Sequence, residues 1–132
     1  MRLKRILVAN RGEIALRIIK TIKEMGLEAV AMYVEIDKNS AYVQNSDLAF
    51  RLDNGYTDQD EIINKAKQFN VDAIHPGYGF LSENAEFCKK VKNEKIVWIG
   101  PDAETIELMG DKINSKNFCV KQNIPTLSKT SK

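Results

Sequence analysis

The sequence has 132 residues, of which 43% are hydrophobic and 29% are charged, and its formal net charge is +2 at pH 7. These are the values of one ordinary globular domain, and no apolar run approaches the roughly 18 residues that a membrane helix needs. The 20 basic residues are dispersed along the chain, which speaks against nucleic acid as a partner. Only Ile6–Ala9 follow the basic start as an apolar run, so we expect no export signal and no membrane span.

The two cysteines, Cys88 and Cys119, stand far apart in helical patterns and outside any C-x-x-C or Cys/His cluster. Such placement gives no support to a metal site or a disulfide framework. We therefore expect two buried thiols in a cytoplasmic protein that has no metal site of its own.

The start of the chain predicts a strand, a helix and a second strand. Residues 5–9 form a short apolar run, which suits a strand buried on both faces. From Glu13 to Met25 the apolar residues recur at helical spacing, and Gly26 follows where helices commonly stop. Residues 29–34 are again continuously apolar. This succession indicates a βαβ unit with parallel strands.

The same alternation continues along the chain. Further strands are predicted at 48–52, 71–74 and 95–99. Between them we expect a helix capped by Thr57, with Asp60 in the capping-box position, and a helix over 83–92 capped by Ser82. The pattern predicts an α/β fold, a Rossmann-like open parallel sheet with helices on both faces.

Two short helical stretches follow, at 102–109 and 111–122. The second has apolar positions with no partner nearby in sequence, and Pro125 ends its pattern. We therefore expect a Rossmann-like domain over 1–110 and the start of a connector to a further domain over 111–132.

Two loops follow predicted strands at the sheet edge where α/β proteins bind ligands. The first, 9–15, lacks the glycine spacing of a dinucleotide fingerprint and the pattern of a Walker loop. Taken alone, it favours a tight packing turn over a ligand site.

The second loop, 75–84, combines two glycines, two aromatic residues, an acid and the only histidine of the chain. Long glycine-bearing loops more often serve function than structure, because glycine raises the entropy that is lost when a loop is ordered. Tyr78 and Glu83 are the better candidates for lining a site. His75 is favoured as a satisfied turn residue rather than a catalyst.

A third segment, 109–112, predicts a helix start with Asp111 as its cap and Lys112 in the first turn. A lysine there opposes the helix dipole at a cost of about 0.3–1 kcal/mol, which a bound phosphate reverses. Because the chain has many lysines, Lys112 taken alone is best interpreted as an ordinary surface residue.

Taken together, three segments of the chain resemble the biotin carboxylase family. They read ILVANRGEIALRI at 6–18, HPGYGFLSEN at 75–84 and IGPDAETIELMGDK at 99–112, and they match in the same order and at the same spacings. The family comprises the biotin carboxylase subunit of acetyl-CoA carboxylase and the matching parts of pyruvate, propionyl-CoA and methylcrotonyl-CoA carboxylases. The resemblance covers nearly the whole chain.

The resemblance implies a pre-ATP-grasp domain of a ligase. That enzyme uses MgATP to activate bicarbonate as carboxyphosphate and then carboxylates N1 of biotin on a carrier protein. By the same resemblance, Lys112 contacts ATP, and Tyr78, Gly79 and Glu83 line the pocket for biotin and bicarbonate, with Glu83 near the metals.

The resemblance also implies partners. The helix that carries Arg17, Lys20 and Glu24 takes part in a homodimer, with a solvated helix face as the alternative. The other partners are the ATP-grasp and C-terminal domains, the biotin carboxyl carrier protein and a carboxyltransferase. The family's phosphate lid, magnesium-binding glutamates and biotin-steering arginine match no part of these 132 residues. The chain alone is therefore expected to be inactive.

Alternatives from other classes fit less well. A receiver domain needs paired acids after its first strand, where this chain has Asn10 and Arg11, and a flavodoxin-like domain needs a Ser/Thr-rich phosphate loop there. A carbamoyl-phosphate synthetase or another carboxylate-amine ligase would keep the link to ATP, but the unbroken 75–84 loop favours biotin carboxylase. Asn45–Asp47 departs from the Ala-Asp-Glu common among relatives, which leaves open which carboxylase the chain serves.

Overall fold

The computed structural model describes residues 3–101, 103 and 105–106. The connector predicted over 111–132, and with it Lys112 and Cys119, lies outside these residues. Of the helix predicted over 102–109, the three described residues are helical. Within the described part of the chain, no helix is long and apolar enough to cross a membrane.

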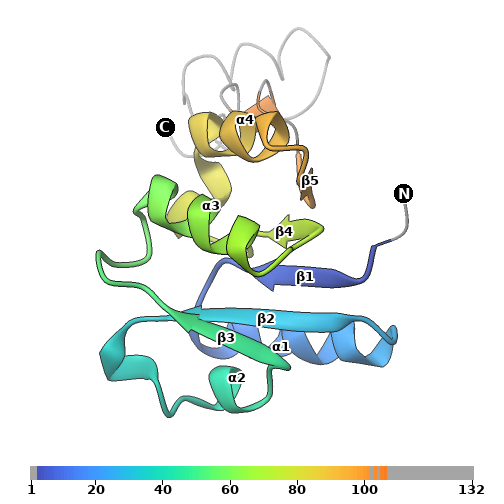
Figure 1. Ribbon diagram of the computed structural model, residues 1–132, viewed down its shortest axis with the longest axis vertical. Coiled ribbons are helices and arrows are strands. Elements are labelled where there is room, and N and C mark those ends of the chain that lie inside the picture. The colour runs from blue at the N-terminus through green and yellow to red at the C-terminus, as the bar shows by residue number, and fades with distance from the viewer. Residues whose placement is uncertain (1–2, 102, 104, 107–132) are drawn as a thin grey trace, which may run out of the picture.

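One sheet of five parallel strands organises the structure (Figure 1). Its order is β3-β2-β1-β4-β5. The strands are β1 (Arg5–Val8), β2 (Glu28–Tyr33), β3 (Leu48–Arg51), β4 (Ala73–His75) and β5 (Val97–Trp98). The strands predicted from continuous apolar runs are all present, and they are parallel as expected.

The helices and 3-10 turns that connect the strands are α1 (Gly12–Glu24), η1 (Glu35–Asp37), α2 (Ala41–Gln44), α3 (Gln59–Gln68), η2 (Phe80–Glu83) and α4 (Ala85–Asn93). Alternate residues of each strand face opposite sides of the sheet. In β1, Ile6 and Val8 pack with α1, whereas Leu7 packs with α3 and α4. The sheet therefore has helices on both faces, and this part of the prediction is confirmed.

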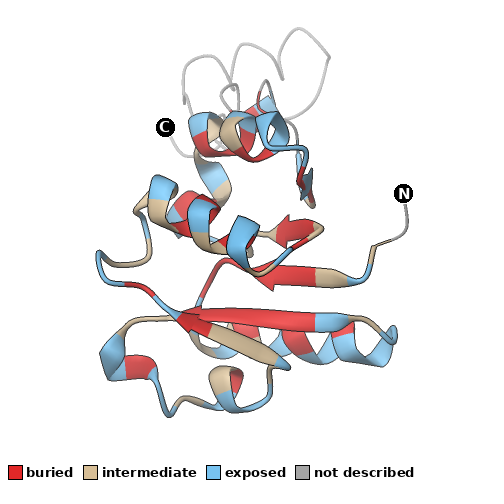
Figure 2. Cartoon of the chain, viewed as in Figure 1, coloured by how far each residue is buried: buried red, intermediate tan, exposed pale blue. Residues whose placement is uncertain are grey.

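The core lies on both sides of the sheet. Figure 2 shows the buried residues along the strands and on the helix surfaces that face them. On one face Ile19 of α1 and Tyr42 of α2 are buried, and on the other Ile62 of α3 and Phe87 of α4 are buried. Because the central strands are covered on both faces, they read as unbroken apolar runs rather than alternating ones.

Two helix starts differ from the sequence prediction. The cap of α3 is Asp58 rather than Thr57, and its Oδ1 accepts a hydrogen bond from the Glu61 amide at 3.0 Å. The cap of α4 is Asn84 rather than Ser82, and its Oδ1 accepts from the Phe87 amide at 2.8 Å. In the second case the 3-10 turn η2 includes Ser82, so the α-helix begins only after it.

The segment between β2 and β3 contains structure that the sequence pattern did not predict. Both η1 and α2 are too short for a helical period to be recognised. They are held by tertiary contacts, since Asp37 and Tyr42 are both buried.

Candidate functional site

The two loops selected from the sequence meet at one edge of the sheet. β1 and β4 are neighbours, with Val8 beside His75 in the ladder. The strand that follows β1 lies on one side of this pair, and the strand that follows β4 lies on the other. In open α/β sheets, ligands bind outside the carboxyl ends of the strands at such a switch point. The residues after Val8 and His75 therefore form the candidate site.

Asn10 joins the two loops. Its side chain is 2% exposed, and its Nδ2 donates hydrogen bonds to the carbonyl oxygens of Pro76, at 2.8 Å, and Tyr78, at 2.6 Å. Its Oδ1 accepts a hydrogen bond from the Arg11 amide at 2.8 Å. Asn10 is not among the site residues predicted from the sequence, although a polar residue directly after a buried strand at the ligand-binding edge is a usable signal.

The 75–84 loop turns outward beyond this contact. Gly77 and Gly79 both have a φ of +69°, in the left-handed region that favours glycine. The Tyr78 side chain between them is 78% exposed. A Cβ added at Gly79 would meet nothing within 4 Å, so the space beside Tyr78 is open. Among the described residues, none accepts a hydrogen bond from the Gly79 amide.

His75 is satisfied by its own loop. Its Nδ1 accepts a hydrogen bond from the Gly77 amide at 3.1 Å, which places the proton of the neutral ring on Nε2. Partial burial lowers the pKa of His75 because it penalises the charged imidazolium. The geometry agrees with the expectation of a turn residue rather than a catalyst.

An ion pair between an exposed arginine and a buried aspartate lies at the same sheet edge, next to the end of β2. Arg11 donates to both carboxylate oxygens of Asp37, at 2.7 and 2.8 Å, and Asp37 is only 5% exposed. These hydrogen bonds lower the pKa of Asp37; burial opposes the shift, and a hydrogen bond from the Tyr56 hydroxyl adds to it. The same pair raises the pKa of Arg11, so both groups remain charged at neutral pH.

Tyr56 connects this ion pair to the glycine loop. Its hydroxyl contacts that of Tyr42 at 2.8 Å, and the Arg11 guanidinium lies 5.8 Å from its ring centre. The Phe80 ring packs against the Tyr56 ring with 5.4 Å between centroids. Burial raises the pKa of Tyr56, which therefore stays neutral. The loop thus has one anchor at Asn10 and a second at Phe80.

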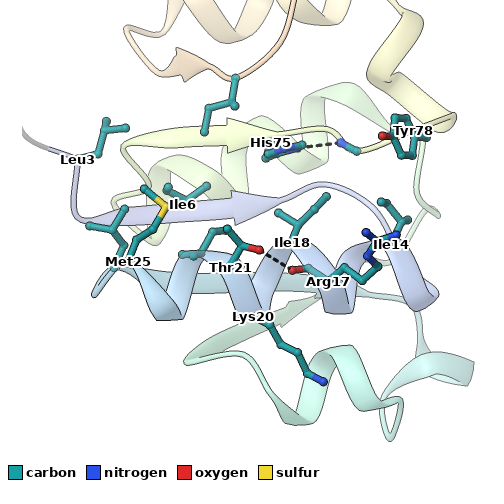
Figure 3. Close-up of a pocket in the computed structure, with 14 residues that line it drawn as sticks. Leu3, Ile6, Ile14, Arg17, Ile18, Lys20, Thr21, Met25, His75 and Tyr78 are labelled. Carbon is teal, nitrogen blue, oxygen red and sulfur yellow. Dashed lines mark hydrogen bonds between the residues drawn. The ribbon is translucent and has the colours of Figure 1, made fainter.

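An apolar groove of about 610 Å³ runs along α1 and ends at this loop (Figure 3). Ile14 and Ile18 of α1 line it together with Met25, the C-terminal cap of the helix, and Tyr78 lies at one end. Arg17 and Lys20 also border the groove. Leu3 and Ile99 are also among its lining residues.

The structure brings some of the predicted site residues together and separates others. Tyr78 and Gly79 share the open side of the loop, and Glu83 is exposed at the end of η2. The residues predicted for the dimer contact are all exposed on α1; they are Arg17, Lys20 and Glu24. The predicted ATP contact at Lys112 lies outside the described residues.

Comparisons with known proteins relate this chain to one family. The family model described as biotin carboxylase, N-terminal domain, matches residues 2–106. The propionyl-CoA carboxylase alpha chain of Mus musculus, a mitochondrial protein, is 43% identical over 128 residues, which cover 93% of this chain and 18% of that protein. Pyruvate carboxylase of Pichia angusta is 42% identical over 134 residues, which cover 96% of this chain and 11% of that protein.

Solved structures agree with these relatives. The biotin carboxylase subunit of pyruvate carboxylase superimposes with a TM-score of 0.91 at 45% identity, covering 95% of this chain and 29% of that one. The biotin carboxylase domain dimer of Hydrogenobacter thermophilus 2-oxoglutarate carboxylase, in complex with MgADP, ADP and bicarbonate, gives 0.91 at 41% identity, covering 96% and 29%. The chain therefore spans less than a third of each of these four proteins.

Proposed function

This chain belongs to the biotin carboxylase N-terminal domain family, and from that premise we propose that it forms the amino-terminal part of an ATP-dependent ligase. The ligase would carboxylate biotin, held on a carrier protein, at the expense of MgATP and bicarbonate. Bicarbonate and MgADP are ligands of the Hydrogenobacter domain, and we carry them to this chain as part of the proposal.

The observation that carries the proposal is the glycine loop at the switch point of the sheet. Its exposed part presents the Tyr78 ring, the open face of Gly79 and an amide without a described acceptor. A flat ureido ring has one carbonyl oxygen and two N–H groups, so it fits a site that combines an aromatic face with a main-chain donor. Tyr78 and Gly79 would border biotin, and Glu83 would lie at the rim of the pocket.

The described residues fit biotin better than they fit magnesium. Among them, no three His, Cys, Asp or Glu side chains come together as metal ligands. We propose that the magnesium ligands come from other parts of the complete enzyme and that Lys112 reaches ATP. ATP, when bound, supplies the free energy that activates bicarbonate. One lysine does not offset the translational and rotational freedom that a nucleotide loses on binding, so the chain alone should be inactive.

Partners follow from the same proposal. The ATP-grasp and C-terminal domains, the biotin carrier and a carboxyltransferase would complete the enzyme. We place the homodimer contact on the exposed side of α1, at Arg17, Lys20 and Glu24. A cytoplasmic location is part of the proposal.

A chimera tests the function. Residues 1–132 would replace the matching segment of the biotin carboxylase subunit of pyruvate carboxylase, which is 45% identical. We expect the chimera to form ADP in a reaction that requires both bicarbonate and biotin, and we expect the 132-residue chain alone to form none. Circular dichroism of the chimera would establish that it is folded. A folded chimera without activity would contradict the proposal.

Two variants of the chimera test the residue assignments. Tyr78→Ala is expected to raise the KM for biotin about tenfold, and Lys112→Gln to raise the KM for ATP about tenfold, because each removes one contact to its own ligand. Lys92→Gln, an exposed lysine on α4, is the control and should change neither constant. If the two effects were exchanged, or if both variants raised both constants equally, the assignments would be wrong.

A further inference from the structure

We propose that Asn10 is a positioning residue for biotin carboxylation, which holds the 76–79 turn so that Tyr78 and Gly79 face the incoming biotin ring. The inference rests on the function proposed above, because it gives Asn10 a role in the site that those two residues border. It adds a residue from the first loop, for which the sequence alone favoured a packing turn.

Both side-chain donors of Asn10 are used on the loop backbone. A side-chain amide has two N–H donors, and both are used, one on the Pro76 carbonyl and one on the Tyr78 carbonyl. Its oxygen accepts from the Arg11 amide, and the side chain is buried. Asn10 therefore acts on the loop backbone rather than on a substrate.

This contact sets the direction of the turn. The carbonyls of Pro76 and Tyr78 both point at Asn10, and Gly77 lies between them with a φ of +69°. A Cβ at Gly77 would lie 2.7 Å from the Asn10 nitrogen, so the close approach requires glycine. With its carbonyl held inward, Tyr78 is left with its ring exposed.

A second contact holds the far end of the turn. Phe80 packs on Tyr56, whose own position depends on Asp37 and Arg11. Gly79 lies between the two anchored residues Tyr78 and Phe80 in sequence, and a Cβ added to it would meet no other residue within 4 Å. Glycine raises the entropy that a loop loses on ordering, so a turn without the Asn10 anchor would have to be ordered by the ligand itself. The loss should therefore fall on biotin binding and spare ATP.

The catalytic test is a double-mutant cycle in the chimera. We expect Asn10→Ala to raise the KM for biotin about tenfold and to leave the KM for ATP unchanged. In a Tyr78→Ala background the same change should have little further effect, because Asn10 acts through the placement of Tyr78. Asn10→Asp keeps the shape but loses both donors and places a carboxylate against two carbonyl oxygens, so its effect should be at least as large as that of Asn10→Ala. If only packing mattered, it would match the unmodified protein.

The structural test uses the 132-residue chain itself. Asn10→Ala should speed hydrogen exchange at the Gly77 and Ser82 amides, which bond within the loop, about tenfold or more, and should leave the Ile19 amide in α1 unchanged. Asn45→Ala is the matched control, since the exposed Asn45 amide also donates to a carbonyl, that of Ala41 at 2.7 Å.

The outcomes separate this inference from the function on which it rests. An unmodified chimera that does not carboxylate biotin contradicts the proposed function, and the role of Asn10 falls with it. An active chimera in which Asn10→Ala raises the constants for biotin and ATP alike, or adds fully to Tyr78→Ala, overturns only the inference. Unchanged exchange at Gly77 and Ser82 overturns it as well.

Discussion

At the scale of single residues, the ion pair of Arg11 and Asp37 links loops that are far apart in sequence. The Arg11 hydrogen bonds hold the pKa of Asp37 below its usual value of about 3.9. The folded state therefore binds a proton at Asp37 less readily than the unfolded state does. The resulting stability is fully present above about pH 4 and is lost as the pH falls through the lower pKa of the folded state.

Asp37→Asn should lower the free energy of unfolding at pH 7 by about 1–3 kcal/mol, because it removes the charge that pairs with Arg11 and replaces one of the two acceptor oxygens by a donor group. It should also flatten the acid limb of the stability curve. Urea unfolding at pH 7 and near pH 3 measures both effects. Asp53→Asn, an exposed partner of Arg51 at 3.0 Å, is the control and should change stability by less than about 0.5 kcal/mol. Equal effects of the two variants would refute the role of the ion pair.

At the scale of elements, the residue that caps a helix depends on local geometry as well as on residue type. Ser, Thr, Asp and Asn are all good caps, and the segment before α3 offers two of them, Thr57 and Asp58. Only Asp58 takes the cap, and its other carboxylate oxygen accepts from the Asn54 side chain at 2.9 Å. Glu61, three residues later, accepts from the Asp53 and Asn54 amides and so fastens the preceding turn to the helix.

Asp58→Ala should therefore cost about 0.5–2 kcal/mol of stability, whereas Thr57→Ala should cost less than about 0.5 kcal/mol. The pair differs by one position in sequence and serves as its own control. Thermal unfolding followed by circular dichroism would measure the difference. A larger loss of stability from Thr57→Ala than from Asp58→Ala would mean that Thr57 is the cap, as the sequence pattern predicted.

At the scale of the whole molecule, the proposed site needs residues from outside this chain. The family model matches residues 2–106, but the chain covers only a small share of each relative. We expect the natural reading frame to continue past Lys132. A glycine-rich phosphate loop should follow within about fifty residues, and glutamate metal ligands should follow later, because a further domain of ordinary size has room for both. Sequencing the locus decides this. A stop codon directly after Lys132 would contradict the enzyme reading of this chain.

Most of the fold followed from the order and period of apolar residues. The runs 5–9 and 29–34 predicted buried parallel strands, and the helical spacing from Glu13 predicted α1, because burial on two faces or on one stripe leaves a local signature. The glycine loop at 75–84 also stood out by composition. The dimer residues on α1, the assignment of Lys112 and the pocket residues stay predictions.

Contacts between residues far apart in sequence could not be predicted from the sequence pattern. The carbonyls that accept from the Asn10 side chain lie more than sixty positions away, and the carboxylate that accepts from Arg11 lies on η1. No local pattern encodes such pairs, because they depend on which strands become neighbours and where each strand ends. A periodic pattern reports which face of an element is buried, whereas a polar network at a sheet edge depends on how the loops of several strands converge there. The support beneath Tyr78 and Gly79 was therefore decided by the tertiary structure alone.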